Sequence, residues 1–225
     1  MPTVRPVLSP HHRQARLAWA QVYARWTREQ WGHIVFSDES RFCLQGGDGR
    51  MRVWRRTEER YYDNCVREQD RNRGGGIMVW AGIDLEEKTN LIILEGNITA
   101  AAYVDQVINA EIVPLFTRRP HLTLMHDNAR PHTARMTTDH LTNLGIPVLP
   151  WPAKSPDLNP IEHLWDELER RIRNRPRQPT SLQMLRNALL DEWRTIPRNV
   201  WRKVIFSMRQ RCLSVIIAHG GRTKY

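Results

Sequence analysis

Several features are scarce in this 225-residue sequence, and each absence excludes a class of protein. No run of eighteen or more apolar residues exists, which excludes a conventional transmembrane helix. The first sixteen residues lack the apolar core of a secretory signal peptide, so we expect an intracellular protein. No glycine- and serine-rich or low-complexity linker divides the chain, so we expect one α/β domain with excursions.

Cysteine is also scarce. Cys43, Cys65 and Cys212 are the three cysteines, and their spacing fits no Cys-x-x-Cys pattern. The sequence therefore indicates neither a disulfide framework nor a zinc site, and we interpret the three as buried or incidental thiols.

Lysine is nearly absent, whereas arginine is abundant. The 34 basic residues comprise four lysines and thirty arginines, the formal net charge is +10 and the pI is about 10.2. The guanidinium fork binds phosphate oxygens in a bidentate manner, so this bias favours a polyanionic partner, nucleic acid ahead of a membrane. GC-rich coding is the alternative explanation of the arginine content.

Apolar periodicity predicts a mixed α/β order. We expect helices or helical segments at 11–26, 100–116, 133–144, from 159, 181–196 and 199–218, and strands at 34–44, 77–83, 91–94, 122–125 and 147–149. Short connections between the first three strands predict an antiparallel meander. The order predicts a mixed five-stranded sheet covered by helices, as in the ribonuclease H-like fold.

An arginine-rich excursion interrupts this order between about 46 and 76. Basic and aromatic residues alternate there, and 51–54 could form a short strand. This composition suits phosphate contact with stacking, or a protein partner, and a solvated loop is the alternative. The candidate residues for DNA binding or dimer contact are Arg50, Arg52, Trp54, Arg55, Arg56, Arg71 and Arg73.

Three acids are candidates for chemistry. Asp38 and Asp127 each follow an apolar run and are expected at strand ends, where adjacent strands would bring their carboxylates together at one edge of the sheet. Such carboxylates repel each other unless a divalent cation lies between them. Taken singly, each Asp could instead be a turn or cap residue.

Glu162 is the third acid. We expect Asn159 to be an N-cap, with Pro160 as the first helical residue and Ile161, Leu164 and neighbouring apolar residues on one stripe. Glu162 then fits the third position of a capping box. It is equally free to point over the end of the sheet, and the pattern alone leaves both roles open.

Four motifs carry a resemblance to a known family. Residues 37–42 (SDESRF), 127–132 (DNARPH), 151–152 (WP) and 155–162 (SPDLNPIE) resemble the catalytic domain of Tc/mariner-superfamily transposases. The match runs from about residue 6 to the last residue. Thirty-four residues separate Asp127 from Glu162, as in the Tc-like branch.

The resemblance implies a metal-dependent endonuclease and strand transferase. Asp38, Asp127 and Glu162 would form the Asp-Asp-Glu triad that binds two Mg²⁺ ions, with Mn²⁺ as a substitute. The DNA would be transposon ends and a target cut at TA, and the enzyme would be a homodimer on double-stranded DNA in the nucleus. No membrane or small-molecule substrate is implied. Four further residues would contact the metal ligands or DNA: Glu39, Asn128, His132 and Asn159.

The resemblance also suggests a division of the chain. We expect a linker and helix at 1–30 and the catalytic domain at 31–225, with the inserted loop at about 46–76 and C-terminal helices at about 159–219. Relatives carry helix-turn-helix modules ahead of this domain, and we expect a truncated chain without them. A non-catalytic DNA-binding or assembly module derived from a transposase is the alternative function.

Overall fold

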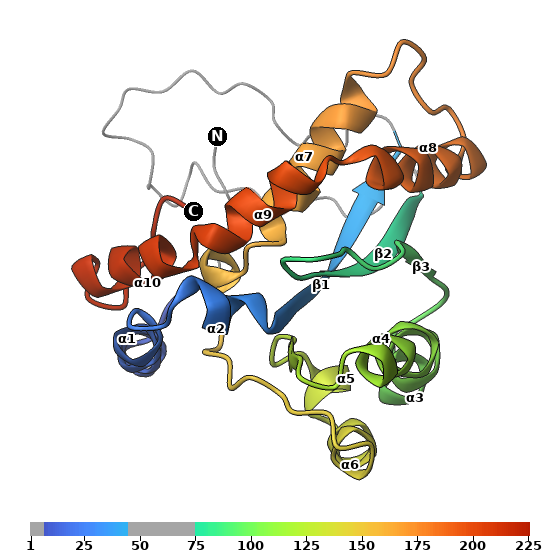
Figure 1. Ribbon diagram of the computed structural model, residues 1–225. Helices are drawn as coiled ribbons and strands as arrows, with labels where there is room; N and C mark the ends of the chain where they lie inside the picture. The colour runs from blue at the N-terminus through green and yellow to red at the C-terminus, as the bar shows by residue number, and fades with distance from the viewer. Residues whose placement is uncertain (1–6, 45–74) are drawn as a thin grey trace, which may run out of the picture.

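The computed structural model describes residues 7–44 and 75–225 (Figure 1). The excursion at 46–76, with its seven candidate residues, lies almost entirely outside the described residues. The elements follow in the order α1 (Pro10–Tyr23), α2 (Arg28–Gly32), β1 (Ile34–Cys43), β2 (Gly76–Ile83), β3 (Ile92–Leu94), α3 (Ala100–Tyr103), the π-helix η2 (Val104–Ile112), α4 (Val113–Arg118), β4 (Thr123–Met125), α5 (Arg130–Thr133), α6 (Arg135–Asn143), the 3₁₀-helix η3 (Pro156–Leu158), α7 (Glu162–Arg173), α8 (Leu182–Thr195), α9 (Arg198–Phe206) and α10 (Met208–Ile217).

The sheet has four strands in the order β3-β2-β1-β4. β1 pairs with β2 in antiparallel register from Phe36 opposite Ile83 to Cys43 opposite Gly76, and β2 pairs with β3 in the same sense. β4 runs parallel to β1, with Phe36 opposite Met125. The predicted antiparallel meander is therefore confirmed, with one parallel strand added at its edge.

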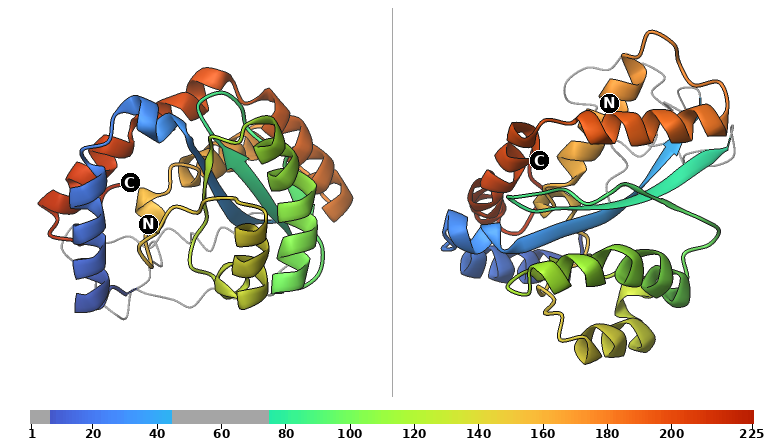
Figure 2. Two further views of the ribbon diagram at one scale, coloured as in Figure 1. Left: turned by 60° about the horizontal axis from the view of Figure 1, so that its bottom comes forward. Right: turned by 45° about the vertical axis from the view of Figure 1, so that its right-hand side comes forward.

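Helices cover both faces of the sheet (Figure 2). Successive strand residues point to opposite faces, so Phe36 packs in one core with α7 to α10 and Val35 in a second core with α3, η2 and α6. In β2, likewise, Val79 belongs to the core that contains Phe36, and its neighbour Trp80 belongs to the core that contains Val35. Each face is thus buried against its own layer of helices.

The predicted fifth strand is not formed as a strand. Val148 makes a single parallel bridge to Leu124, with hydrogen bonds from Leu124 N to Pro147 O and from Leu149 N to Leu124 O. Pro147 and Pro150 on either side have no N–H to donate, so the ladder cannot extend. Within the described residues the sheet stops at four strands.

Two helix starts follow the local sequence. Ser9 caps α1 with Pro10 as its first residue, and Thr27 caps α2 in a capping box with Gln30, as its spacing predicts. The helix predicted at 133–144 is broken at Ala134, whose backbone is extended, and the helix predicted at 199–218 is divided at Ser207. The predicted helix at 100–116 contains the π-helical turns of η2, which apolar spacing does not reveal.

The N-terminal helix packs on the last helix. α1 and α10 lie side by side, and Trp19 of α1 belongs to the same core as Val215 of α10. No helix of the described ranges is long and apolar enough to cross a membrane.

Candidate active site

The sheet opens beside Asp38, because β4 stops before β1 does. β1 continues without interruption to Cys43, so Asp38 lies in the middle of a strand, and the prediction that it stands at a strand end is wrong. Pairing with β4 ends at Phe36 opposite Met125, and the chain then leaves the sheet towards Asp127. Ser37 Oγ closes this end by donating to Met125 O at 2.8 Å. Asp127 therefore follows the strand that pairs beside β1, and its charge contributes to the raised pKa of Asp38.

Asp38 points to the face of the sheet covered by α7. Trp165 Nε1 of that helix donates to Asp38 Oδ2 at 3.1 Å. Burial raises the pKa of Asp38 well above its ordinary value, and the charges of Glu162 and Glu39 raise it further. No described lysine or arginine forms an ion pair with this carboxylate.

Glu162 is the first residue of α7 rather than its third. Ile161 occupies the N-cap position without a side-chain cap, so the capping-box interpretation of Glu162 is wrong. Burial raises the pKa of Glu162 to about 7, Asp166 one turn later adds to the shift, and Arg211 opposes it. The side chain is therefore free of a capping role and faces other acids.

Asp127 is held by His132. His132 Nδ1 lies 2.8 Å from Asp127 Oδ1, and Ala129 N donates to the same oxygen at 2.8 Å. His132 Nε2 lies 3.3 Å from Glu39 Oε1, so the imidazole bridges the two acids. Burial favours neutral His132, but hydrogen bonds to Asp127 and Glu39 outweigh it and raise its pKa to about 10. The ring is charged at neutral pH and lies between Glu39 of β1 and Asp127, which follows β4.

Two further side chains support that imidazole. His126 stacks on His132 with ring centroids 4.8 Å apart, and Tyr103 of α3 lies 4.2 Å from His132. Tyr103 Oη is 3.1 Å from His126 Nδ1. Burial and the nearby charge of His132 lower the pKa of His126 to about 3, so one ring of the stacked pair is neutral and the other charged.

The two candidate asparagines play different structural parts. Asn159 is buried and donates through Nδ2 to Ser37 O at 3.2 Å, which ties the loop before Glu162 to β1. It is not the N-cap of α7, contrary to prediction. Asn128 Nδ2 donates to Trp151 O at 2.8 Å and so links the Asp127 and Trp151 segments.

A buried ion cluster fixes the loop that leads to Glu162. Arg16 of α1 makes a bidentate pair with Asp157, with both N–O distances 2.7 Å, and is fully buried. Arg211 Nη1 donates to Asp157 O at 2.7 Å, and Thr223 Oγ1 donates to Asp157 Oδ2 at 2.9 Å. Burial lowers the pKa of Arg211 to about 10, so it remains charged at neutral pH.

The acids fit a divalent cation by their chemistry. Asp38 and Glu162 are like-charged oxygen ligands whose pKa values rise because the groups are buried and because other acids lie near them. Asp127 keeps Oδ2 free of the contacts that hold Oδ1. Among the described side chains, however, no three His, Cys, Asp or Glu residues are grouped closely enough to form a ready-made metal site.

Sequence reasoning missed several of these residues. Trp165 was assigned to the apolar stripe, and its indole N–H gave no separate signal. Arg16, Asp157 and Arg211 meet across 141 and 54 residues of sequence, which no local pattern can reveal. His126 directly precedes Asp127 and is the missed residue that its position could have indicated.

Comparisons with known proteins find relatives by sequence and by fold. The family model described as "DDE superfamily endonuclease" matches residues 33–185. Tc1 transposase of Caenorhabditis elegans is 34% identical over 226 residues, covering 100% of this chain and 82% of the relative. Tc3 transposase of the same organism is 32% identical over 225 residues, covering 98% of this chain and 65% of the relative.

Solved structures share the fold. The crystal structure of the catalytic domain of Mos1 mariner transposase superposes with a TM-score of 0.75 at 22% identity, covering 99% of this chain and 100% of that one. A pre-cleavage Mos1 transpososome gives 0.77 at 22% identity, over 99% of this chain and 66% of the other. The Mos1 transposase is from Drosophila mauritiana. The predicted ribonuclease H-like fold is confirmed, with four strands in place of five.

Proposed function

The chain belongs to the DDE superfamily of endonucleases, and from this premise we propose that it cuts DNA at transposon ends and joins the freed 3′ ends to a target. The observation that carries the proposal is the partly buried Asp38, which faces Glu162, Glu39 and Asp127 without a cationic partner among the described residues. A folded protein keeps such unbalanced acids where a cation completes them.

Asp38, Asp127 and Glu162 are the proposed metal ligands and the residues on which catalysis depends. Two Mg²⁺ ions, or Mn²⁺ in their place, would activate the attacking hydroxyl and neutralise the leaving oxygen of the scissile phosphate. Divalent ions of this kind accompany the Mos1 catalytic domain in structures with Raltegravir and Mg or Mn. Both are hard cations that prefer the oxygen ligands these three acids supply.

The neighbouring side chains hold the acids in place. Trp165 fixes Asp38 through Oδ2, and His132 fixes Asp127 through Oδ1 while its charge balances Glu39. Asn159 ties the Glu162 loop to the backbone of β1. These are positioning roles, because each residue acts through an acid or through the strand that carries it.

The family also suggests a substrate, an oligomeric state and a cellular location. We propose duplex DNA as the partner, both as transposon ends and as a target with TA sites, a homodimer as the form on DNA, and the nucleus as the location. Support for end binding comes from Mos1, whose paired-end complexes have been solved with a left transposon end and with Mn. The arginine content and the net charge of +10 suit a polyanion of this kind.

A nicking assay tests the proposal. Supercoiled plasmid is incubated with Mg²⁺ or Mn²⁺ and with the parent chain or with Asp38→Asn, Asp127→Asn or Glu162→Gln. We expect each variant to lose nicking completely while its circular dichroism spectrum and its DNA affinity in EDTA stay unchanged. Asp139→Asn, an exposed acid on α6, is the matched control and should nick normally.

Two results would overturn it. Full nicking by purified Glu162→Gln would remove that acid from the site. DNA binding by the parent chain without nicking under any divalent ion would instead favour the non-catalytic DNA-binding or assembly module.

A further inference from the structure

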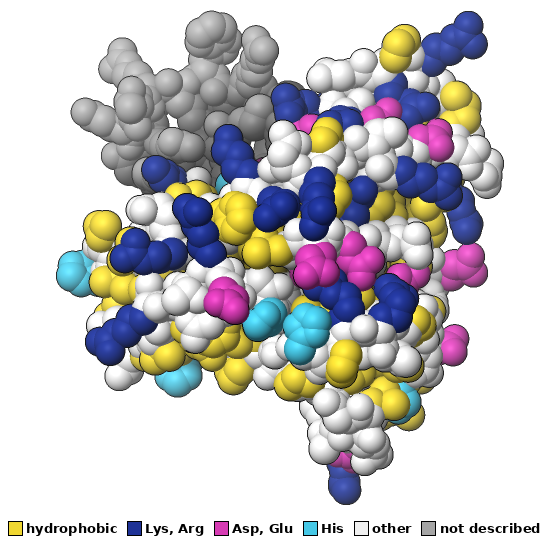
Figure 3. Space-filling view, viewed as in Figure 1, with side chains coloured by type: hydrophobic (Ala, Val, Ile, Leu, Met, Phe, Trp, Pro, Cys, Tyr) yellow, Lys and Arg dark blue, Asp and Glu magenta, His cyan; other side chains and the backbone are white. Residues whose placement is uncertain are grey.

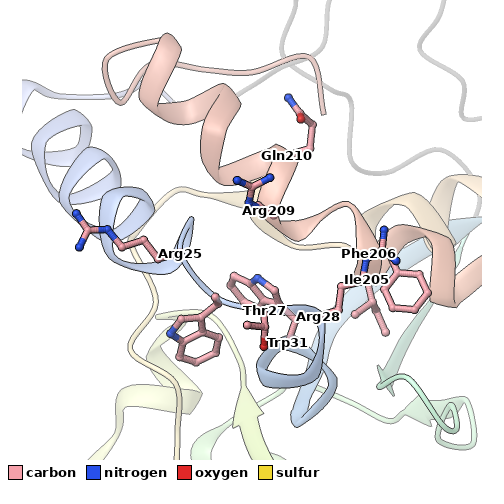
Figure 4. A pocket seen from close by; sticks show the side chains of 9 residues that line it. Arg25, Thr27, Arg28, Trp31, Ile205, Phe206, Arg209 and Gln210 are labelled. Atoms are coloured by element: carbon pink, nitrogen blue, oxygen red, sulfur yellow. The ribbon is translucent and has the colours of Figure 1, made fainter.

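A groove lies between the N-terminal and C-terminal helices. A hollow of about 420 Å³ is lined by residues of α2, α9, α10 and the segment that joins α1 to α2, and a second of about 520 Å³ adjoins it between α1 and α10. Arg25 and Arg209 line both hollows, so the two form one continuous groove. Figure 4 shows the smaller hollow, with Arg28 on α2, Arg209 on α10 and Arg25 in the turn after α1. We call it the arginine groove.

The three arginines of the groove carry unbalanced charge. Arg25, Arg28 and Arg209 are exposed, and none forms an ion pair with a described acid. Many other arginines are paired, such as Arg119 with Asp84 and Arg175 with Glu192. Among the residues that the structure describes, no Asp or Glu lines either hollow.

An aromatic ring holds two guanidinium groups at one rim. Arg28 lies over the ring of Phe206 with 5.2 Å to its centroid, and Arg202 lies over the same ring at 5.6 Å. Cation–π contact orients a guanidinium without neutralising it, so the hydrogen-bonding edges stay available to a ligand. Lysine and arginine side chains also gather over α9 and α10 in Figure 3, so the groove lies within a basic face.

The groove is separate from the acids. Arg209 and Arg211 are two residues apart on α10 and therefore point about 200° apart around the helix axis. Arg211 is buried on Asp157 beside the Glu162 loop, whereas Arg209 lines the groove. Arg28 likewise precedes β1, while Asp38 lies in the middle of that strand.

We propose that the arginine groove binds backbone phosphates of duplex DNA away from the bond that is cut, and so sets the affinity and orientation of the DNA. Bidentate guanidinium–phosphate pairing would give each of the three arginines the anionic partner that no described acid supplies. The groove offers charge and ring faces rather than a base-reading element, so its contacts position DNA without selecting a sequence. The proposal rests on the proposed function only in taking DNA as the polyanion.

The test compares two triple variants with the same net charge. Arg25→Gln, Arg28→Gln and Arg209→Gln remove the groove, and Arg135→Gln, Arg177→Gln and Arg186→Gln remove three exposed arginines elsewhere. Binding of a 30-bp duplex is measured by fluorescence anisotropy in EDTA across a salt series. Each phosphate contact contributes about 0.9 to the slope of log K against log salt, so the groove variant should lose about 2 to 3 from that slope.

We expect its affinity at 100 mM salt to fall about 10- to 100-fold, against less than about 3-fold for the control variant. Equal losses in both variants, or none in the groove variant, would overturn the proposal. A groove variant that binds DNA normally but changes its oligomeric state in sedimentation would make the groove a protein interface instead. If the triple variant does not fold, the single variants Arg25→Gln and Arg209→Gln must still each lower the slope by about 1.

Failure here is distinguishable from failure of the proposed function. The binding assay contains no divalent ion and detects no cleavage, so it reads the groove alone. The nicking assay with Asp127→Asn reads the acids alone.

Discussion

Arginines of α10 and of the region around α1 are found in two opposite situations. On one side Arg16 of α1 is buried in a bidentate pair with Asp157, and Arg211 of α10 is buried against the backbone carbonyl of Asp157. On the other side Arg25, in the turn after α1, and Arg209 of α10 line an exposed groove that no described acid lines. A buried charge must be paired within the protein, because it has no access to water, whereas an exposed charge can remain unpaired until a ligand arrives. The contrast separates arginines that hold the fold from arginines that are available to DNA.

The largest expected effect comes from breaking the buried pair. Asp157→Ala leaves Arg16 buried without its carboxylate partner, and we expect it to lower the free energy of unfolding by about 3–5 kcal/mol. Urea denaturation measures the loss. Arg25→Gln, in the turn after α1 on the groove side, is the matched control and should change the free energy of unfolding by no more than about 0.5 kcal/mol. Similar values for the two variants would mean that the distinction between the two sides is wrong.

A smaller loss of stability is expected from Arg16→Lys, which keeps the positive charge but removes the bidentate guanidinium group. Arg16→Lys retains a cation but cannot make both 2.7 Å contacts to Asp157 together with those to Gly220 O and Gly221 O. We expect a loss of about 1–3 kcal/mol in the free energy of unfolding, because buried acceptors lose their donors. Arg28→Lys should leave stability unchanged. A neutral Arg16→Lys would show that charge alone holds the cluster.

The smallest effect is a local difference in thiol reactivity. Burial raises the pKa of Cys212 on α10 to about 12, whereas Cys43 is exposed. At pH 8 we expect iodoacetamide to label Cys43 and to spare Cys212 in the native chain, as peptide mass spectrometry can measure. The unfolded chain releases the Cys212 proton first as pH rises, so the stability contributed by this thiol falls between about pH 9 and 12 and stays lost above that range.

The labelling rate of Cys212 also distinguishes the buried side of α10 from its groove side. Asp157→Ala should speed the labelling of Cys212 because it loosens the packing of α10, and Arg209→Gln should leave it slow. Labelling of Cys212 as fast as that of Cys43 in the parent chain would contradict the burial on which this prediction depends.

The sequence alone predicted those helices and strands that depend on interactions between residues close together in the chain. Ser9 with Pro10 and Thr27 with Gln30 predicted helix starts because capping acts within one turn, and apolar alternation predicted the meander. Within the site, local spacing and the family motifs therefore indicated the three acids, whose role as ligands remains a proposal.

What failed depends on the rest of the molecule. Asp38 lies within a strand because β2 stays paired through Cys43, although an acid after an apolar run resembles a strand end. Asn159 fits an N-cap by type, but its amide is occupied by Ser37 O, and the helix begins later. Ala134 and Ser207 interrupt helices that apolar spacing alone would continue. In each case a tertiary contact or a local backbone conformation decided against the pattern.

Arg16 also has a consequence for the order in which the domain is built. Its side chain closes on Asp157, 141 residues later, and on Gly220, 204 residues later. Gly220 has φ +75°, and a Cβ there would lie 1.9 Å from Arg13 O, so the late segment must lie directly on the first helix. During synthesis the first helix therefore waits for Gly220 to leave the ribosome, and such distant contacts form slowly. The contacts of Arg16 with Gly220 and Gly221, which hold the residue that also binds Asp157, therefore form late in synthesis.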